Sequence, residues 1–197
     1  MSSQFFKLSY PPSNPHGYCK VDHLQGIDDL WAVGQGASLR ENPPGRITMA
    51  MHEDEPTNTV LPDNVRNTDS LLIVSPRVRA FLQQRAVGHI EFLPLDILDH
   101  KGNVASGEYS IAHLTDHVDC IDVAASGVTW ANQGLATQRI LDLNELTIDS
   151  SRVPQDRELF FPRYFAETPI VRAELAEALK AAGFTNMKFR AVASSGE

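Results

Sequence analysis

The stretch LLIVSPRVRAFLQQRAVGHIEFLPLDILDHKGN, residues 71–103, determines the fold. A short apolar run leads into Ser75, a residue type that caps helices, and Pro76 takes the favoured first helical position. Four apolar side chains then fall on one helical face: Val78, Phe81, Leu82 and Ala86. The helix is expected to end near Gly88. A strand with apolar side chains at Ile90, Phe92 and Leu95 should follow, and then a turn at residues 100–103.

The same pattern recurs 97 residues later without a gap. The first set of positions is Ile73, Val74, Val78, Leu82, Val87, Ile90, Phe92 and Leu95, and the second is Ile170, Val171, Leu175, Leu179, Phe184, Met187, Phe189 and Val192. Gly183 stands where a second helix would need a left-handed residue after its end. Any two amphipathic helix–strand pairs can agree in part by coincidence. The matched spacing from the helix through the following strand favours an internal duplication.

The sequence therefore predicts an α+β protein with a mixed or antiparallel sheet. The two related strand–helix–strand units should pack on a shared sheet, because each unit buries only one face by itself. Further strands are expected at residues 4–10, 46–51, 108–114 and 118–123, and loops at 11–17 and 52–64. Residues 1–197 are expected to form a single domain, with residues 1–65 as an N-terminal extension of the same fold.

Composition and charge narrow the choice of partner. Acidic residues outnumber basic ones 25 to 17, which gives a net charge of −8. Nucleic acids and anionic membranes repel such a surface, so neither is expected as a partner, whereas a basic protein is permitted. No apolar run approaches the roughly 18–20 residues that cross a bilayer. The N-terminus lacks the features of a secretory signal, so the protein is expected to stay in the cytoplasm.

Cysteine usage agrees with that location. Cys19 and Cys120 are the only two cysteines, and they are 101 residues apart without a CxxC motif. One disulfide across a long loop is the alternative, and two reduced thiols are favoured.

Local signatures of catalysis are missing from the sequence. It has no GxSxG elbow, no phosphate-binding loop and no HExxH motif, and the only GxG is at Gly34–Gly36. The segment HLTDHVDCID, residues 113–122, offers His113 and His117 four residues apart, as on a metal-binding helix face. Its apolar residues suggest a strand instead, and on a strand the two histidines would be about 13 Å apart. Neither catalytic residues, a metal nor a cofactor is therefore expected.

Acidic and aromatic side chains are the candidates for binding a partner. Glu53, Asp54 and Glu55 form an acidic loop, which is either a solvated surface or an electrostatic patch for a basic protein. Asp116 and Asp119 carry charge in the histidine-containing segment. Trp31 and Trp130 are candidate interface anchors, although a core position is favoured for Trp130 and partial exposure is the alternative.

The order of motifs resembles a known family. Residues 71–103 contain, in order, an apolar strand, VS, an amphipathic helix and a VEFLPV-like strand. Further segments of this kind are Glu108–Tyr109, the VDCID of residues 118–122, the SRVP of residues 151–154, Leu159–Phe160, and a final ALxxAG-type helix before Phe189 and Val192. Together they resemble the immunity-protein family numbered eleven of bacterial polymorphic toxin systems, formerly a domain of unknown function. The resemblance covers about residues 66–193, and two positions depart from it: Arg172 replaces a serine cap and Ala86 replaces a glycine.

The resemblance implies a binding role. A member of this family would bind a cognate toxin and occlude it, without catalysis. A basic toxin such as a nuclease would suit the charge of −8. Two alternatives stay open from the residues alone. One is a metal-assisted hydrolase that uses His113, His117 and Asp119, and the other is a regulatory partner of a secretion system.

Overall fold

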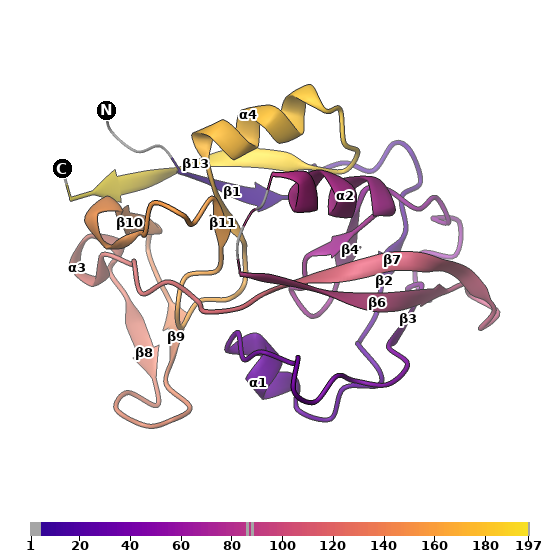
Figure 1. Ribbon diagram of the computed structural model, residues 1–197, viewed down its shortest axis with the longest axis horizontal. Helices are drawn as coiled ribbons and strands as arrows, with labels where there is room; N and C mark the ends of the chain where they lie inside the picture. Colours follow the sequence, from indigo (N-terminus) through magenta and orange to yellow (C-terminus); the bar gives the residue numbers. More distant parts are fainter. Residues whose placement is uncertain (1–4, 86, 88, 197) are drawn as a thin grey trace.

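The computed structural model describes residues 5–85, 87 and 89–196, and these form an α+β arrangement of two large sheets, one small sheet and short helices (Figure 1). The six-stranded sheet has the spatial order β2 (Lys20–Val21), β4 (Asn64–Asn67), β5 (Ile73–Val74), β7 (Val104–Leu114), β6 (Ile90–Leu98) and β3 (Thr48–Ala50). The five-stranded sheet has the order β10 (Thr147–Asp149), β13 (Lys188–Ser195), β1 (Phe5–Ser9), β12 (Ile170–Arg172) and β11 (Leu159–Phe160). The α+β prediction is confirmed.

Short helices and a separate two-stranded sheet complete the described part of the chain. The helices are α1 (Leu30–Gly34), α2 (Pro76–Gln84), α3 (Val123–Ser126), α4 (Ala173–Ala181) and the 3-10 helix η1 (Ser150–Arg152). The two-stranded sheet is the hairpin of β8 (Thr129–Ala131) and β9 (Arg139–Asp142). Within the described part of the chain, no helix has the length and apolar content that crossing a membrane requires.

The repeated units coincide element by element. Helix α2 shifted by 97 residues gives the bounds of helix α4, and strand β5 shifted in the same way starts where β12 starts. Ile73 and Leu93 flank Ile111 of β7 from its two sides, and their counterparts Ile170 and Arg190 flank Lys7 of β1. The two units therefore share their pairing register as well as the length of their helices. This agreement across long-range pairs supports the duplication over coincidence.

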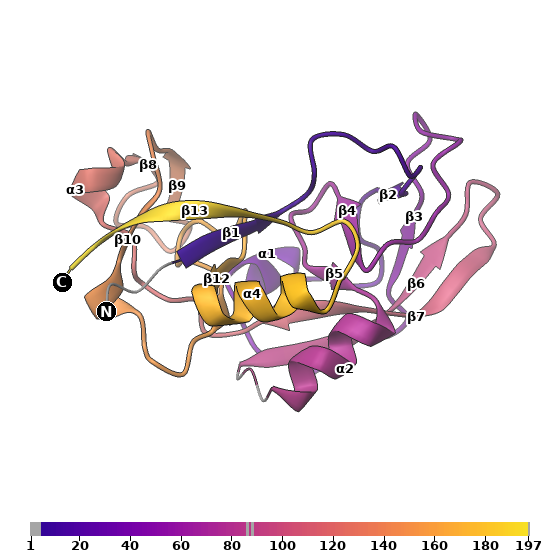
Figure 2. The ribbon, with the colours of Figure 1, turned by 90° about the horizontal axis from the view of Figure 1, so that it is seen from above.

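The sheet arrangement differs from the prediction in one respect. Each unit builds its own sheet, whereas a shared sheet was expected. In the first unit, β5 and β6 run parallel to each other and both pair with β7, which follows β6 through a hairpin. In the second unit, β12 and β13 both pair with β1, which comes from the other end of the chain. The two units meet through their helices. Val78 and Leu82 of α2 and Leu175 and Leu179 of α4 belong to one buried cluster, with both helices on the same side of the molecule (Figures 1 and 2).

Helix ends follow the local sequence where the structure describes them. The Ser75 hydroxyl accepts a hydrogen bond from the Val78 N–H, so the predicted cap of α2 is present. Gly183 has φ of +66°, as its predicted place after α4 requires. Arg172 makes no side-chain cap and instead donates to the carbonyls of Val153, Pro154 and Arg157. The expectations at Ala86 and Gly88 lie outside the described residues.

The strand predicted at residues 118–123 is wrong. Val118 and Ile121 make only isolated bridges, to Pro162 and Ile148. The segment ends where Asp122 caps helix α3 by accepting from the Ala125 N–H at 3.0 Å. The alternating apolar residues therefore reflect one-sided burial of an irregular segment, which gives the same sequence pattern as a strand.

The two cysteines lie in different buried clusters and form no disulfide. Cys19 is buried in the core beneath the six-stranded sheet and Cys120 in the core of the other half, and both are free thiols. Burial raises the pKa of each thiol to about 12, so both are protonated and unreactive at neutral pH.

Candidate functional site

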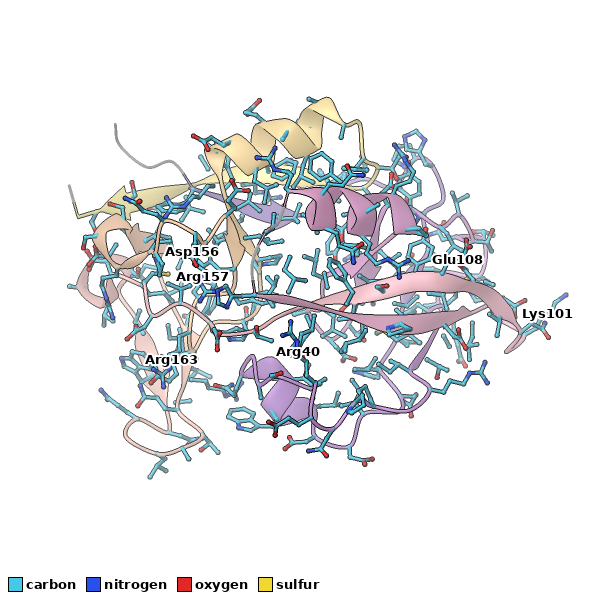
Figure 3. The ribbon with its side chains drawn as sticks, viewed as in Figure 1. Arg40, Lys101, Glu108, Asp156, Arg157 and Arg163 are labelled. Atoms are coloured by element: carbon cyan, nitrogen blue, oxygen red, sulfur yellow. The ribbon has the colours of Figure 1, made fainter. Side chains whose placement is uncertain are left out.

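The predicted partner-binding residues fall into two groups at opposite ends of strand β7. The acidic loop lies beside the turn that precedes β7, because His100 Nε2 is 3.2 Å from the carbonyl oxygen of His52. Asp116 follows the other end of the strand. Eleven residues of strand separate the two groups, a span of about 35 Å. Figure 3 marks this turn with Lys101 and the opposite side of the molecule with Arg163. The structure therefore does not bring the loop together with Asp116.

The acidic loop is an ordered turn. Glu53 and Asp54 are exposed, and Asp54 Oδ2 lies 3.9 Å from the ring of His52. Glu55 is half-buried, and its Oε2 accepts from the Asn58 amide at 2.7 Å. Only Glu53 and Asp54 thus present carboxylates that a partner could contact freely.

Asp116 occupies a tight turn between β7 and the following segment. Its φ is +55°, a left-handed conformation that aspartate tolerates better than most residues. Its N–H donates to the carbonyl of Gly36 at 3.2 Å, which ties the end of helix α1 to this turn. The His89 ring lies between two carboxylates, 3.0 Å from Asp116 and 3.6 Å from Asp156. Both carboxylates are largely exposed, so the cluster is acidic and accessible to a partner.

Asp119 lies further along the same segment. Its Oδ2 is 2.8 Å from Arg152, and both side chains are about half exposed. Because the guanidinium neutralises this carboxylate, Asp119 offers a partner less charge than Asp116 does.

Trp130 is half-buried, and its exposure is intermediate between the core position and the interface position that the sequence left open. Its ring meets the Tyr164 ring edge to face, with centroids 5.6 Å apart, and packs against the core cluster around Ile140. The Arg163 guanidinium covers the Tyr164 ring at 4.9 Å. Trp130 therefore anchors the β8–β9 hairpin to the body and shows only part of its ring to solvent.

Helix α1 and the hairpin each carry two exposed large apolar side chains. Leu30 and Trp31 of α1 are 46% and 44% exposed, and Leu135 and Leu141 of the hairpin are 64% and 60% exposed. Figure 1 shows α1 and the hairpin projecting from the same side of the molecule. We use the name α1–hairpin face for the side of the molecule that carries these two elements. Its residues are Leu30 and Trp31 of α1, Trp130, Leu135 and Leu141 of the hairpin, and Asp116, which is hydrogen-bonded to the segment after α1. Sequence reasoning missed all three leucines, Leu30, Leu135 and Leu141, and only Leu135 had a signal, its place in a polar, glycine-containing stretch.

The two histidines of the hydrolase alternative are used internally. His113 is 4% exposed, and its Nε2 lies 2.7 Å from the carbonyl oxygen of Ala37. His117 packs on Phe161, and burial, together with the neighbouring His113, lowers its pKa to about 4. Both line a cavity of only about 40 Å³, which has room for roughly one water molecule. Among the described residues, no three His, Cys, Asp or Glu side chains are grouped to hold a metal ion.

Glu91 is a buried carboxylate with a structural role. It accepts from the Ser38 hydroxyl at 2.5 Å and the Leu39 N–H at 2.9 Å, and it lies 3.3 Å from Arg40. Burial alone would raise the pKa of Glu91, but these hydrogen bonds and the nearby positive charge hold it below its ordinary value. In Figure 3, Arg40 lies between α1 and the sheet. Glu91 thereby fixes the segment after α1 against β6.

Comparison with known proteins places these observations in a family. No curated protein matches the chain. The family model described as "Immunity protein family (Imm11)" matches residues 13–194, so the match begins well before the residue 66 expected from the sequence motifs. Because the match covers nearly the whole sequence, this chain belongs to the Imm11 immunity protein family.

Proposed function

We propose that this protein binds a cognate bacterial toxin in the cytoplasm and neutralises it by occluding the toxin's active site, without catalysis. Family membership supports an immunity function in general. The observation that carries the binding mode is the α1–hairpin face, on which Trp31, Leu135 and Leu141 are exposed and Asp116 presents an exposed carboxylate. Exposed aromatic and aliphatic anchors surrounded by charge are typical of protein interfaces.

Electrostatics support a basic toxin. The net charge is −8, and such a charge accelerates the encounter with a positively charged protein. Exposed carboxylates occur both at the α1–hairpin face and at the Glu53–Asp54 turn. Charge alone gives speed and selectivity of encounter, and the apolar anchors, once the toxin covers them, would supply slow dissociation.

Co-expression tests the proposal. The toxin polypeptide made by the same strain is expressed in a sensitive host, with and without this protein, and survival is counted. Protection by the wild-type chain, together with co-purification of a stoichiometric complex, is the expected result. Survival without a complex, or chemical modification of the toxin by this protein, would contradict neutralisation by occlusion.

A matched variant pair assigns the surface. Trp31→Ala removes an exposed anchor on α1, and Val104→Ala removes a similarly exposed apolar side chain at the far end of β7. Loss of protection by the first variant alone would support the α1–hairpin face. Equal protection by both variants would exclude Trp31 as an anchor.

A further inference from the structure

Strand β6 has one edge that is paired over only part of its length. On one side it pairs with β7 from Ile90 to Leu98. On the other side β3 covers only residues 96–98. No described residue forms a backbone bridge or hydrogen bond with the outer edge of residues 90–94. A strand edge of this kind offers unpaired N–H and C=O groups to another chain.

Two prolines are the reason that the edge is open. Continuing the β3–β6 register backwards would place residues 42–46 beside residues 90–94. Those positions include Pro43 and Pro44, which have no N–H to donate, followed by Gly45. Thr48 also pairs with Gln25, which draws the start of β3 to another segment. The chain before β3 therefore leaves the edge of β6.

The alternation of the ladder identifies the free groups. The Asp96 N–H donates outward to the Ile47 carbonyl at 3.0 Å, and the Leu98 carbonyl accepts outward from the Met51 N–H at 2.9 Å. Even-numbered residues of β6 thus direct their backbone groups away from β7. The outward groups of residues 90–94 are the N–H and C=O of Ile90 and Phe92 and the C=O of Pro94. Pro94 lacks only an N–H that would have faced outward, which is where strands tolerate proline.

The open edge lies at the floor of a groove of about 480 Å³. Leu39, Arg40, Pro43 and Pro44 form one wall, and Gln83 of helix α2 contributes to the other. The rim is locally neutral, because Arg40 lies 3.3 Å from Glu91 and Arg46 lies 2.7 Å from Asp96. The half-buried Phe92 also lines the groove. The groove therefore combines a backbone ladder with a lining that is apolar at Leu39, Pro43, Pro44 and Phe92.

We propose that an extended segment of the toxin docks in this groove and adds a strand to the edge of β6. The inference rests on the proposed function and adds a mode of binding to it. Backbone complementarity requires a strand-like occupant with an apolar side chain beside Phe92. A second copy of this chain is the other strand source. Two copies would repel each other, because each carries a net charge of −8, whereas a basic toxin would be attracted.

Amide hydrogen exchange tests the docking mode, with the toxin polypeptide from the co-expression experiment as the probe. In the free protein the Ile90 and Phe92 amides should exchange fast, and the inward-facing Glu91 and Leu93 amides slowly. Adding the toxin should slow Ile90 and Phe92 at least tenfold and leave Glu91 and Leu93 slow. Tight toxin binding with unchanged exchange at Ile90 and Phe92 would overturn the docking mode and leave the proposed function standing. Absence of toxin binding by the wild type would overturn both. If the Ile90 and Phe92 amides instead exchange more slowly as the protein concentration rises in the absence of toxin, the occupant of the groove is a second copy of this chain and the toxin proposal is overturned.

A pair of variants isolates the backbone contribution. Phe92→Ala removes the ring and keeps the outward N–H, whereas Phe92→Pro removes both without breaking a bond to β7. We expect Phe92→Pro to weaken toxin binding at least tenfold more than Phe92→Ala. Gln83→Trp is a second variant that fills the groove from α2 and leaves the β6 backbone intact, and it should also weaken binding at least tenfold. Wild-type affinity in Gln83→Trp, or equal affinity in the two Phe92 variants, would overturn the proposal.

Discussion

At the scale of single residues, Asp63 joins the two repeated units. This carboxylate is 6% exposed and accepts from the Ser75 hydroxyl at 2.6 Å, at the start of helix α2. It also accepts from the N–H of Thr185 at 2.9 Å and its hydroxyl at 3.1 Å, after helix α4. Arg77 completes the set at 3.2 Å. One side chain therefore fixes the beginning of one helix to the end of its counterpart.

Asp63→Asn should destabilise the protein by about 2–4 kcal/mol, because an amide replaces a buried charge-assisted acceptor with a donor that faces donors. Urea unfolding measures the loss. Asp28→Asn is the matched control, since Asp28 is exposed, and it should change stability by less than about 0.5 kcal/mol. Equal effects of the two substitutions would show that Asp63 does not hold the units together.

His117 should make stability depend on pH. Burial lowers its pKa from 6.5 to about 4 in the folded protein, so the unfolded chain binds the proton more tightly. Its contribution is fully present above pH 6.5 and is lost as the pH falls toward 4, by up to about 3 kcal/mol. His117→Gln should flatten the stability profile between pH 6.5 and 4.5, where most carboxylates are still ionised. An unchanged slope in that window would assign the effect to other groups.

At the scale of elements, the β8–β9 hairpin is a two-stranded sheet that depends on the body for its position. Ile140 is 4% exposed and donates its N–H to the Tyr164 carbonyl at 3.0 Å, and Trp130 packs on the Tyr164 ring. Leu135 and Leu141 contribute little to that anchoring, because they are the most exposed large apolar residues described. They are therefore available to a partner.

The double variant Leu135→Ser/Leu141→Ser should weaken toxin binding at least tenfold and leave the thermal midpoint within about 2 °C of wild type, since exposed positions contribute little to folding. Calorimetric titration and a melting curve measure the two quantities. A large fall in the melting point would indicate a structural role for the leucines, and unchanged affinity would remove the hairpin from the binding surface.

At the scale of the whole molecule, net charge should govern how fast the toxin associates. Glu53→Lys with Asp54→Lys changes the charge from −8 to −4, because each reversal adds two positive units. The association rate with a basic toxin should fall several-fold, and its dependence on salt should flatten, while dissociation stays the same. Stopped-flow mixing at several salt concentrations measures both. The pair Glu53→Gln/Asp54→Asn should give an intermediate rate. A changed dissociation rate would instead place this turn inside the interface.

The sequence by itself determined the two strand–helix–strand units and the family. Helix caps such as Ser75, the left-handed Gly183 and the apolar periods are local signals, and a short segment expresses them without help from distant residues. The acidic character, and hence the expectation of a basic partner, also follows from composition alone. Residues 118–122 show the limit of local signals, because one-sided burial gave an irregular segment the pattern of a strand.

Only the tertiary structure decided which strands are neighbours. Phe5–Ser9 lies between β12 and β13, more than 160 residues away in sequence, and no local pattern encodes that choice. The separation of the Glu53–Asp54 turn from Asp116 and the open edge of β6 likewise follow from long-range pairing. The physical reason is that periodicity reports which face of a segment is buried, whereas the neighbour that buries it is selected by packing of the whole chain.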